Sequence, residues 1–198
     1  MDDKETLHRY LRGSRDDLLS TLDGLDDYDV RRPLTPTGTN LLGLVKHVAT
    51  VQVGYLGGVF GRPSPLEEVP WAADDAEPDA DLWAGPEESR ADVLAFWAGS
   101  AAHADATVAA LPLDARGVVP WWGPQRRDVT LHAVLVHLLG EVARHAGHAD
   151  ILREGLDGRA GQRPGDANVT GRTAEEWAAH RARLDEAARR AAGRAPRD

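Results

Sequence analysis

Apolar residues recur every three or four positions along four separate segments of the chain, and this spacing predicts four amphipathic helices. The helices are expected at about 4–25, 40–60, 87–111 and 130–155. Asn40 or Thr39 can cap the second helix, and Thr130 opens the fourth. Because no segment shows convincing strand alternation, the pattern predicts an all-α bundle of four long helices.

The connections between the predicted helices are rich in proline, glycine and aspartate. Residues 26–40 contain Pro33, Pro36 and Gly38, which predict a loop. Residues 61–86 form a second connection, whose length is unusual unless it crosses over the bundle or helps to form a site.

The C-terminal part of the chain has a different composition. A Gly-, Arg- and Pro-rich stretch over 155–172 predicts a linker. The capping-box pattern of Thr173 and Glu176 then opens an additional helix. We therefore expect the bundle to occupy residues 1–157, and the linker and helical tail to occupy residues 158–198.

Charge and cysteine content exclude several classes of function. The 198-residue chain has 23 Lys and Arg against 32 Asp and Glu, and it has no cysteine. Disulfides, thiolate metal sites and a cysteine nucleophile are therefore ruled out. A net charge of −9 argues against nucleic acid as a partner. Without a leader pattern or an apolar run near the ~20 residues that span a membrane, we expect a soluble, cytoplasmic protein.

Ionisable residues interrupt the apolar face of the fourth predicted helix. Glu141 and His145 are four residues apart, so their side chains stack on one face. The whole stripe consists of Val134, Leu138, Glu141, His145, His148 and Leu152. Because this stripe begins and ends with apolar residues, we expect it to face the core, where an ionisable group needs a partner or a metal ion.

The second predicted helix supplies one further ionisable residue in an apolar setting. His47 lies beside Leu44 and Val48. Two histidines and one carboxylate are a ligand set of open zinc and non-haem iron sites. The sequence therefore predicts a metal site formed by His47, Glu141 and His145. Two alternatives stay open. His47 could be a partly buried histidine whose hydrogen bonds are satisfied within the protein, and Glu141 and His145 could form an ion pair on a solvated face.

Other residues are candidates for contacts with a substrate or with the ligands. His148 is either a fourth ligand or a substrate contact, and His137 either supports the ligands or belongs to the core. Trp121 and Trp122 are candidates for the mouth of a pocket, with at most one of them facing a ligand. Arg126 is a candidate for contact with an anion.

Three stretches of the chain carry a family resemblance. They are NLLGLVKHVATVQVGYLGGVFGRP, the WWG of the irregular segment, and TLHAVLVHLLGEVARHAGHADILRE. Together they resemble the DinB-like superfamily over about residues 5–157. Within it, the chain is most similar to the actinobacterial branch related to mycothiol-dependent enzymes, of the maleylpyruvate isomerase and mycothiol S-transferase type.

The resemblance implies a four-helix bundle with up-down-down-up topology and a long crossover after the second helix. It also implies metal ligands at His47 and at the pair Glu141 and His145. Many members have histidine at the first position of that pair, whereas the mycothiol-dependent isomerase is similar to this chain in having glutamate. His148 falls where many relatives have glutamine.

The activity implied by the resemblance is metal-dependent transfer of a low-molecular-weight thiol such as mycothiol to a small electrophile. The implied cofactor is a divalent ion, zinc before nickel or iron, and relatives commonly form homodimers. Two alternatives stay open: a metal-dependent hydrolase, and a non-catalytic stress-response or binding module stabilised by its metal.

Overall fold

The computed structural model describes residues 2–73, 75–160 and 168–195. The chain divides into two compact units, Met1–Pro164 and Gly165–Asp198. The second unit holds helix α6 (Ala174–Ala191), which begins at the predicted capping box between Thr173 and Glu176. Residues 161–167 of the predicted linker lie outside the described part of the chain.

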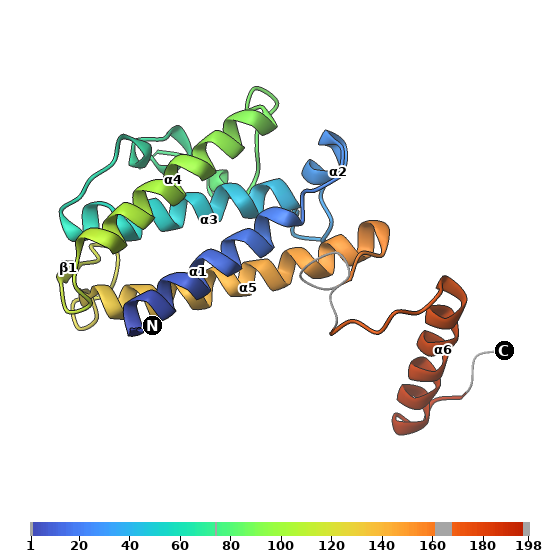
Figure 1. The fold of residues 1–198 in the computed structure, drawn as a ribbon. Coiled ribbons are helices and arrows are strands. Elements are labelled where there is room, and N and C mark those ends of the chain that lie inside the picture. Colours follow the sequence, from blue (N-terminus) through green and yellow to red (C-terminus); the bar gives the residue numbers. More distant parts are fainter. Residues whose placement is uncertain (1, 74, 161–167, 196–198) are drawn as a thin grey trace. The chain divides into compact units, whose positions relative to one another are not determined.

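The first unit is a bundle of four long helices. These are α1 (Asp3–Ser20), α3 (Leu41–Leu56), α4 (Arg90–Ala110) and α5 (Leu131–Asp157). Helices α1 and α5 run in one direction, and α3 and α4 run in the opposite direction (Figure 1). The predicted all-α fold and its up-down-down-up topology are therefore confirmed.

Polar side chains define where these helices begin. Asp2, Asn40, Ser89 and Thr130 each accept a hydrogen bond from a backbone N–H in the first turn of the helix that follows. Each cap satisfies a donor that would otherwise lack an intrahelical partner. Asn40, rather than Thr39, is thus the cap of α3, and Thr130 caps α5 as predicted.

The core lies where the apolar faces of the four helices meet. Leu18 of α1, Leu42 and Val45 of α3, and Leu138 and Val142 of α5 are all fully buried. Helix α1 packs mainly on α5, while α3 contacts both α4 and α5. Helix α3 therefore has neighbours on two sides, which places its side chains at the centre of the unit.

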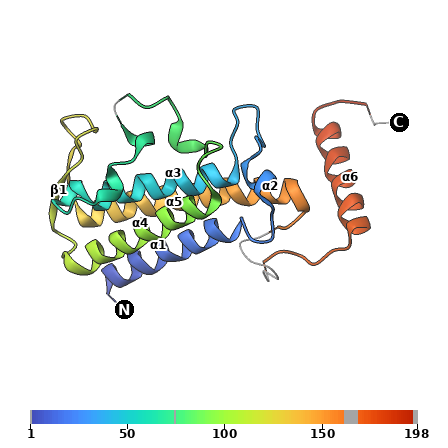
Figure 2. The same ribbon diagram turned by 90° about the horizontal axis from the view of Figure 1, so that it is seen from above.

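The connection from α3 to α4 returns along the bundle, because these two helices run in the same direction. A helix of 16 residues such as α3 is about 24 Å long, so a short turn cannot make this link. The connection contains the 3₁₀ turns η1 (Gly58–Phe60), η2 (Pro65–Glu67), η3 (Pro70–Ala72) and η4 (Ala80–Leu82). It lies over α3, on the side away from α1 (Figure 2).

Glycine permits the closest contact between this connection and α3. A Cβ atom at Gly43 would clash with the backbone carbonyl of Leu82 in η4. Glycine lowers helix propensity, but at Gly43 the missing side chain is what lets the crossover lie directly on α3.

Two small elements were not predicted. Residues 26–40 contain the five-residue helix α2 (Asp27–Arg31), which is capped by the side chain of Asp26. Strands β1 (Arg116–Val118) and β2 (Asp128–Thr130) form an antiparallel hairpin before α5. The prediction that residues 26–40 form only a loop was thus wrong, and the two short strands were missed. Elements of three to five residues are too short to show periodicity in the sequence.

A buried ion pair links α1 to α4. The guanidinium of Arg15, whose side chain is 4% exposed, lies 2.6 Å from Oδ1 of Asp105, and Nε2 of His8 lies 2.8 Å from the same oxygen. Burial alone would raise the pKa of Asp105, but the hydrogen bonds from His8 and Arg15 outweigh it and hold the pKa below its ordinary value.

We predict that Asp105→Asn destabilises the protein more at pH 7 than at pH 3. The stabilisation from a depressed carboxyl pKa is present above the ordinary value of 3.8 and is lost as the pH falls through the lower folded-state value. Because Asp105 is about one-third exposed, the effect at pH 7 should be on the order of 1 kcal/mol. Urea denaturation at both pH values measures it, with the exposed Asp114→Asn as control. An equal loss at both pH values would contradict the prediction.

Candidate metal centre

Three side chains from two neighbouring helices converge beside the core. His47 comes from α3, while Glu141 and His145 come from successive turns of α5. Nε2 of His145 lies 3.0 Å from Oε1 of Glu141, and Nε2 of His47 lies 3.6 Å from the same oxygen. One ligand atom from each residue lies within 4.8 Å of the other two. The three residues form a cluster that could hold a metal ion.

The donor set fits a divalent cation. Ligand atoms at about 2.1 Å from a tetrahedral ion are about 3.4 Å apart, close to the two distances measured to the glutamate oxygen. The side chains of His47, Glu141 and His145 are 19%, 29% and 15% exposed, so each is shielded and still reachable. Among the described residues no fourth His, Cys, Asp or Glu belongs to the group, so a tetrahedral ion held by these three would take its fourth ligand from elsewhere.

Electrostatics favour the metal-binding forms of His145 and Glu141. Burial lowers the pKa of His145, and the nearby His47 lowers it further, which favours the neutral imidazole. Burial would raise the pKa of Glu141, but hydrogen bonds and charge from His145 and His47 outweigh it, so the carboxylate is favoured. A neutral imidazole and an ionised carboxylate are the forms that coordinate a cation.

Asp81 of η4 holds His47 in place, and the sequence pattern did not reveal it. Its Oδ2 lies 2.6 Å from Nδ1 of His47, on the side of the ring away from Glu141. A carboxylate at this position keeps a proton on Nδ1 and leaves the Nε2 lone pair free to bind a cation. Burial would lower the pKa of His47, but the hydrogen bonds and charges of Asp81 and Glu141 together outweigh it and raise the pKa.

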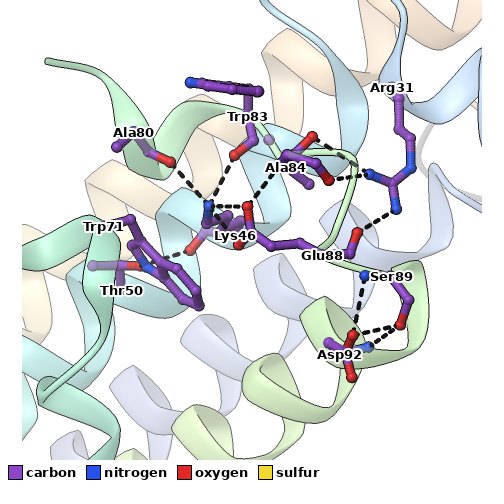
Figure 3. Close-up of polar contacts among 12 residues, drawn as sticks. Arg31, Lys46, Thr50, Trp71, Ala80, Trp83, Ala84, Glu88, Ser89 and Asp92 are labelled. Carbon is purple, nitrogen blue, oxygen red and sulfur yellow. Dashed lines mark hydrogen bonds and ion pairs between the residues drawn. The ribbon is translucent and has the colours of Figure 1, made fainter. Parts of the chain in front are cut away.

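A buried ammonium group anchors the segment that carries Asp81 (Figure 3). The Nζ atom of Lys46 donates hydrogen bonds to the backbone carbonyls of Ala80 and Trp83, each at 2.9 Å. These two carbonyls flank Asp81 in the chain, so the contacts fix η4 on both sides of the carboxylate.

Two further contacts complete the environment of Lys46. Its ammonium pairs with Glu88 at 2.8 Å and lies 4.1 Å from the centre of the Trp71 ring. The indole of Trp71 in turn donates a hydrogen bond to Thr50 on α3 (Figure 3). The sequence offered one signal for this arrangement, the unusual length of the connection, but it did not identify Lys46, because a lysine in a helix is ordinarily solvated.

The structure separates His148 from the cluster. His148 is exposed, and its ring lies 5.5 Å from that of His145. The buried row of α5 in this region runs through Val142, Ala146 and Ala149 instead. The prediction that His148 points into the core was therefore wrong, while its role as a substrate contact stays a prediction.

The other predicted residues gather around Tyr55, two turns after His47 on α3. Trp121 and Trp122 both donate indole N–H bonds to the Tyr55 hydroxyl, at 3.2 and 2.8 Å. The ring of His137 lies 4.9 Å from that of Tyr55. Arg126 is exposed and stacks over Trp122, 5.6 Å from the ring centre. His137 thus belongs to an aromatic cluster rather than to the group of predicted ligands.

A four-helix bundle of this topology, with two histidines and a glutamate that could hold a metal ion, is consistent with the DinB-like class. The Mycothiol-S-transferase (MST) family matches residues 6–158, well over half of the chain, and the chain belongs to this family. The predicted resemblance is confirmed. No curated protein gives a match to the sequence. None of the helices in the described ranges is long and apolar enough to cross a membrane.

We predict that Asp81→Asn weakens zinc binding by about 10- to 100-fold, because His47 loses the carboxylate that orients its ring. Competition with a chromophoric chelator measures the dissociation constant. The matched control is Asp79→Asn, two residues away, where asparagine tolerates the left-handed backbone at φ 64°. Equal zinc affinity in the two variants would show that the contact between Asp81 and His47 does not support the site.

Proposed function

We propose that the protein is a metal-dependent transferase that joins a low-molecular-weight thiol, mycothiol in accordance with its family, to a small electrophile. The observation that carries the proposal is the convergence of His47, Glu141 and His145, with no fourth ligating side chain in the group among the described residues. Membership of the MST family supports the thiol as substrate.

The chemistry requires a thiol from outside the chain, because the protein has no cysteine. A divalent ion held by the three residues would lower the pKa of an approaching thiol well below the free value near ~8.5. In the overall reaction a sulfur–carbon bond forms, the bond from carbon to the leaving group breaks with its electron pair, and the S–H proton passes to solvent.

The chain's own residues orient the reactants and limit water. Asp81 Oδ2 holds the proton on Nδ1 of His47, so that Nε2 faces Glu141. Leu44 and Val48, which precede and follow His47 on α3, are buried in the core. The carboxylates of Glu141 and of Asp81, behind His47, would together offset the charge of a divalent ion held there, so a thiolate would be held by direct coordination rather than by a net positive charge of the site.

The finer assignments follow from the donor set and from the bundle. Imidazole and carboxylate ligands favour zinc, with nickel and iron as alternatives. All proposed ligands lie in residues 1–157, which we therefore propose as the catalytic domain, with residues 158–198 as an appended tail. We further propose that the enzyme acts in the cytoplasm and that it forms a homodimer.

We predict that zinc-loaded protein, purified without a nickel column, conjugates mycothiol to monochlorobimane. His145→Ala should lower kcat/KM by at least about 100-fold, because a site with two protein ligands orients the cation poorly. Chelation should abolish the activity, and added zinc should restore it. Fluorescence of the conjugate measures the rate, and His132→Ala, an exposed histidine at the start of α5, is the control.

Three other outcomes would overturn the proposal. Equal rates for the wild type and His145→Ala across a panel of thiols would show that the candidate metal centre takes no part in the reaction. Turnover of esters or amides without added thiol would indicate a hydrolase. A melting temperature that falls on chelation, with no turnover of any thiol or ester, would indicate a metal that only stabilises the bundle.

A further inference from the structure

A pocket of about 320 Å³ lies between α3 and the crossover. One wall is formed by Val51, Gly54 and Tyr55 of α3, and the opposite wall by Leu66 and Val69 of the crossover. The exposed ring of Trp121 closes one end.

The near end of the pocket is adjacent to His47. Thr50 and Val51, which line it, follow His47 by three and four residues, so they lie on the same face of α3 one turn further on. One turn is about 5.4 Å along the helix axis. A molecule seated in the pocket can therefore present one end to the position where a thiol sulfur would be held.

The polar atoms that border the pocket are already engaged by the protein. Glu67 accepts hydrogen bonds from the backbone N–H groups of Gly58 and Ser64. Thr50 donates to the carbonyl of Lys46 and accepts from Trp71. The pocket thus offers mainly apolar contacts. A group rich in hydroxyls would lose hydrogen bonds to water on entering it.

We infer that this pocket binds the apolar part of the electrophilic substrate, with the reactive carbon at the His47 end. Its volume is about twice the ~150 Å³ of a cavity that holds one benzene ring, so it suits an aromatic or alicyclic group of about eight to twelve carbons. Mycothiol, a hydroxyl-rich sugar thiol, is excluded by the same apolar walls and approaches the metal centre from outside the pocket. The inference rests on the proposed transferase function.

Gly54 controls the width of the pocket. A Cβ atom placed there would lie 3.7 Å from Cη2 of Trp121, which is ordinary van der Waals contact. Alanine therefore fits without displacement, whereas the further atoms of leucine would project into the pocket or push the exposed ring of Trp121 aside. Leucine also has a higher helix propensity than glycine, so Gly54→Leu is expected to fold.

Binding of unreactive probes tests the pocket separately from the chemistry. Zinc-loaded full-length protein should bind N-benzylacetamide at least about 10-fold more tightly than N-methylacetamide, because the benzyl group buries apolar surface. Calorimetry or NMR titration measures both affinities. Gly54→Leu should remove the difference while its zinc affinity stays that of the wild type. The control is Gly155→Leu, at a position on α5 with open space around it, which should keep the preference.

The corresponding chloroacetamides test the link to catalysis. With mycothiol, the ratio of kcat/KM for N-benzylchloroacetamide to that for N-methylchloroacetamide should be about 10 or more in the wild type and in Gly155→Leu. It should fall toward 1 in Gly54→Leu.

The two experiments separate failure of the inference from failure of the proposed function. Conjugation of both chloroacetamides at equal rates, together with equal affinity for the two acetamides, would overturn the pocket assignment and leave the transferase standing. Binding of N-benzylacetamide that depends on Gly54, without conjugation of either chloroacetamide, would uphold the pocket as an apolar binding site and overturn the transferase.

Discussion

The buried ammonium of Lys46 is the contact on which the candidate site depends. An unpaired charge in this position would be strongly destabilising, but three oxygen acceptors and the face of Trp71 surround it. The acceptors all belong to the crossover, so satisfying one lysine fixes a long irregular segment on α3. Asp81 lies between two of them and is thereby held against His47.

Different faces of helix α3 contact the crossover, contribute to the candidate metal centre and line the pocket. Successive residues of a helix point about 100° apart, so Lys46 faces the crossover while His47 faces α5. One and two turns later, Val51 and Tyr55 line the pocket. The anchor of the crossover, the candidate metal centre and the candidate substrate pocket are thus built on a single, well-packed element, which keeps their mutual geometry rigid.

The topology explains why the site needs its crossover. In an up-down-down-up bundle, α3 and α4 are parallel, and the chain must return along α3 before α4 begins. This return covers one side of α3 with backbone carbonyls and carboxylates, which a short turn could not do. The same segment supplies Leu66 and Val69 to the pocket, so a feature that the topology requires also shapes the site.

The sequence by itself predicted the four helices, the cap of α5 at Thr130 and the placement of Glu141 and His145 on one face, because helical periodicity aligns residues four apart. It proposed His47 as their partner from its apolar setting, and it left the cap of α3 open between Asn40 and Thr39. It did not determine the contacts of Asp81 or Lys46, whose partners lie 34 residues away in the sequence, on the other side of the connection from α3 to η4. It also predicted that His148 points into the core, whereas this residue is exposed. The burial of a residue at the edge of a helical stripe depends on the neighbouring elements, which the spacing does not show. Contacts made by a crossover have no periodicity, so only the tertiary structure decided which groups support the cluster and where a substrate can lie.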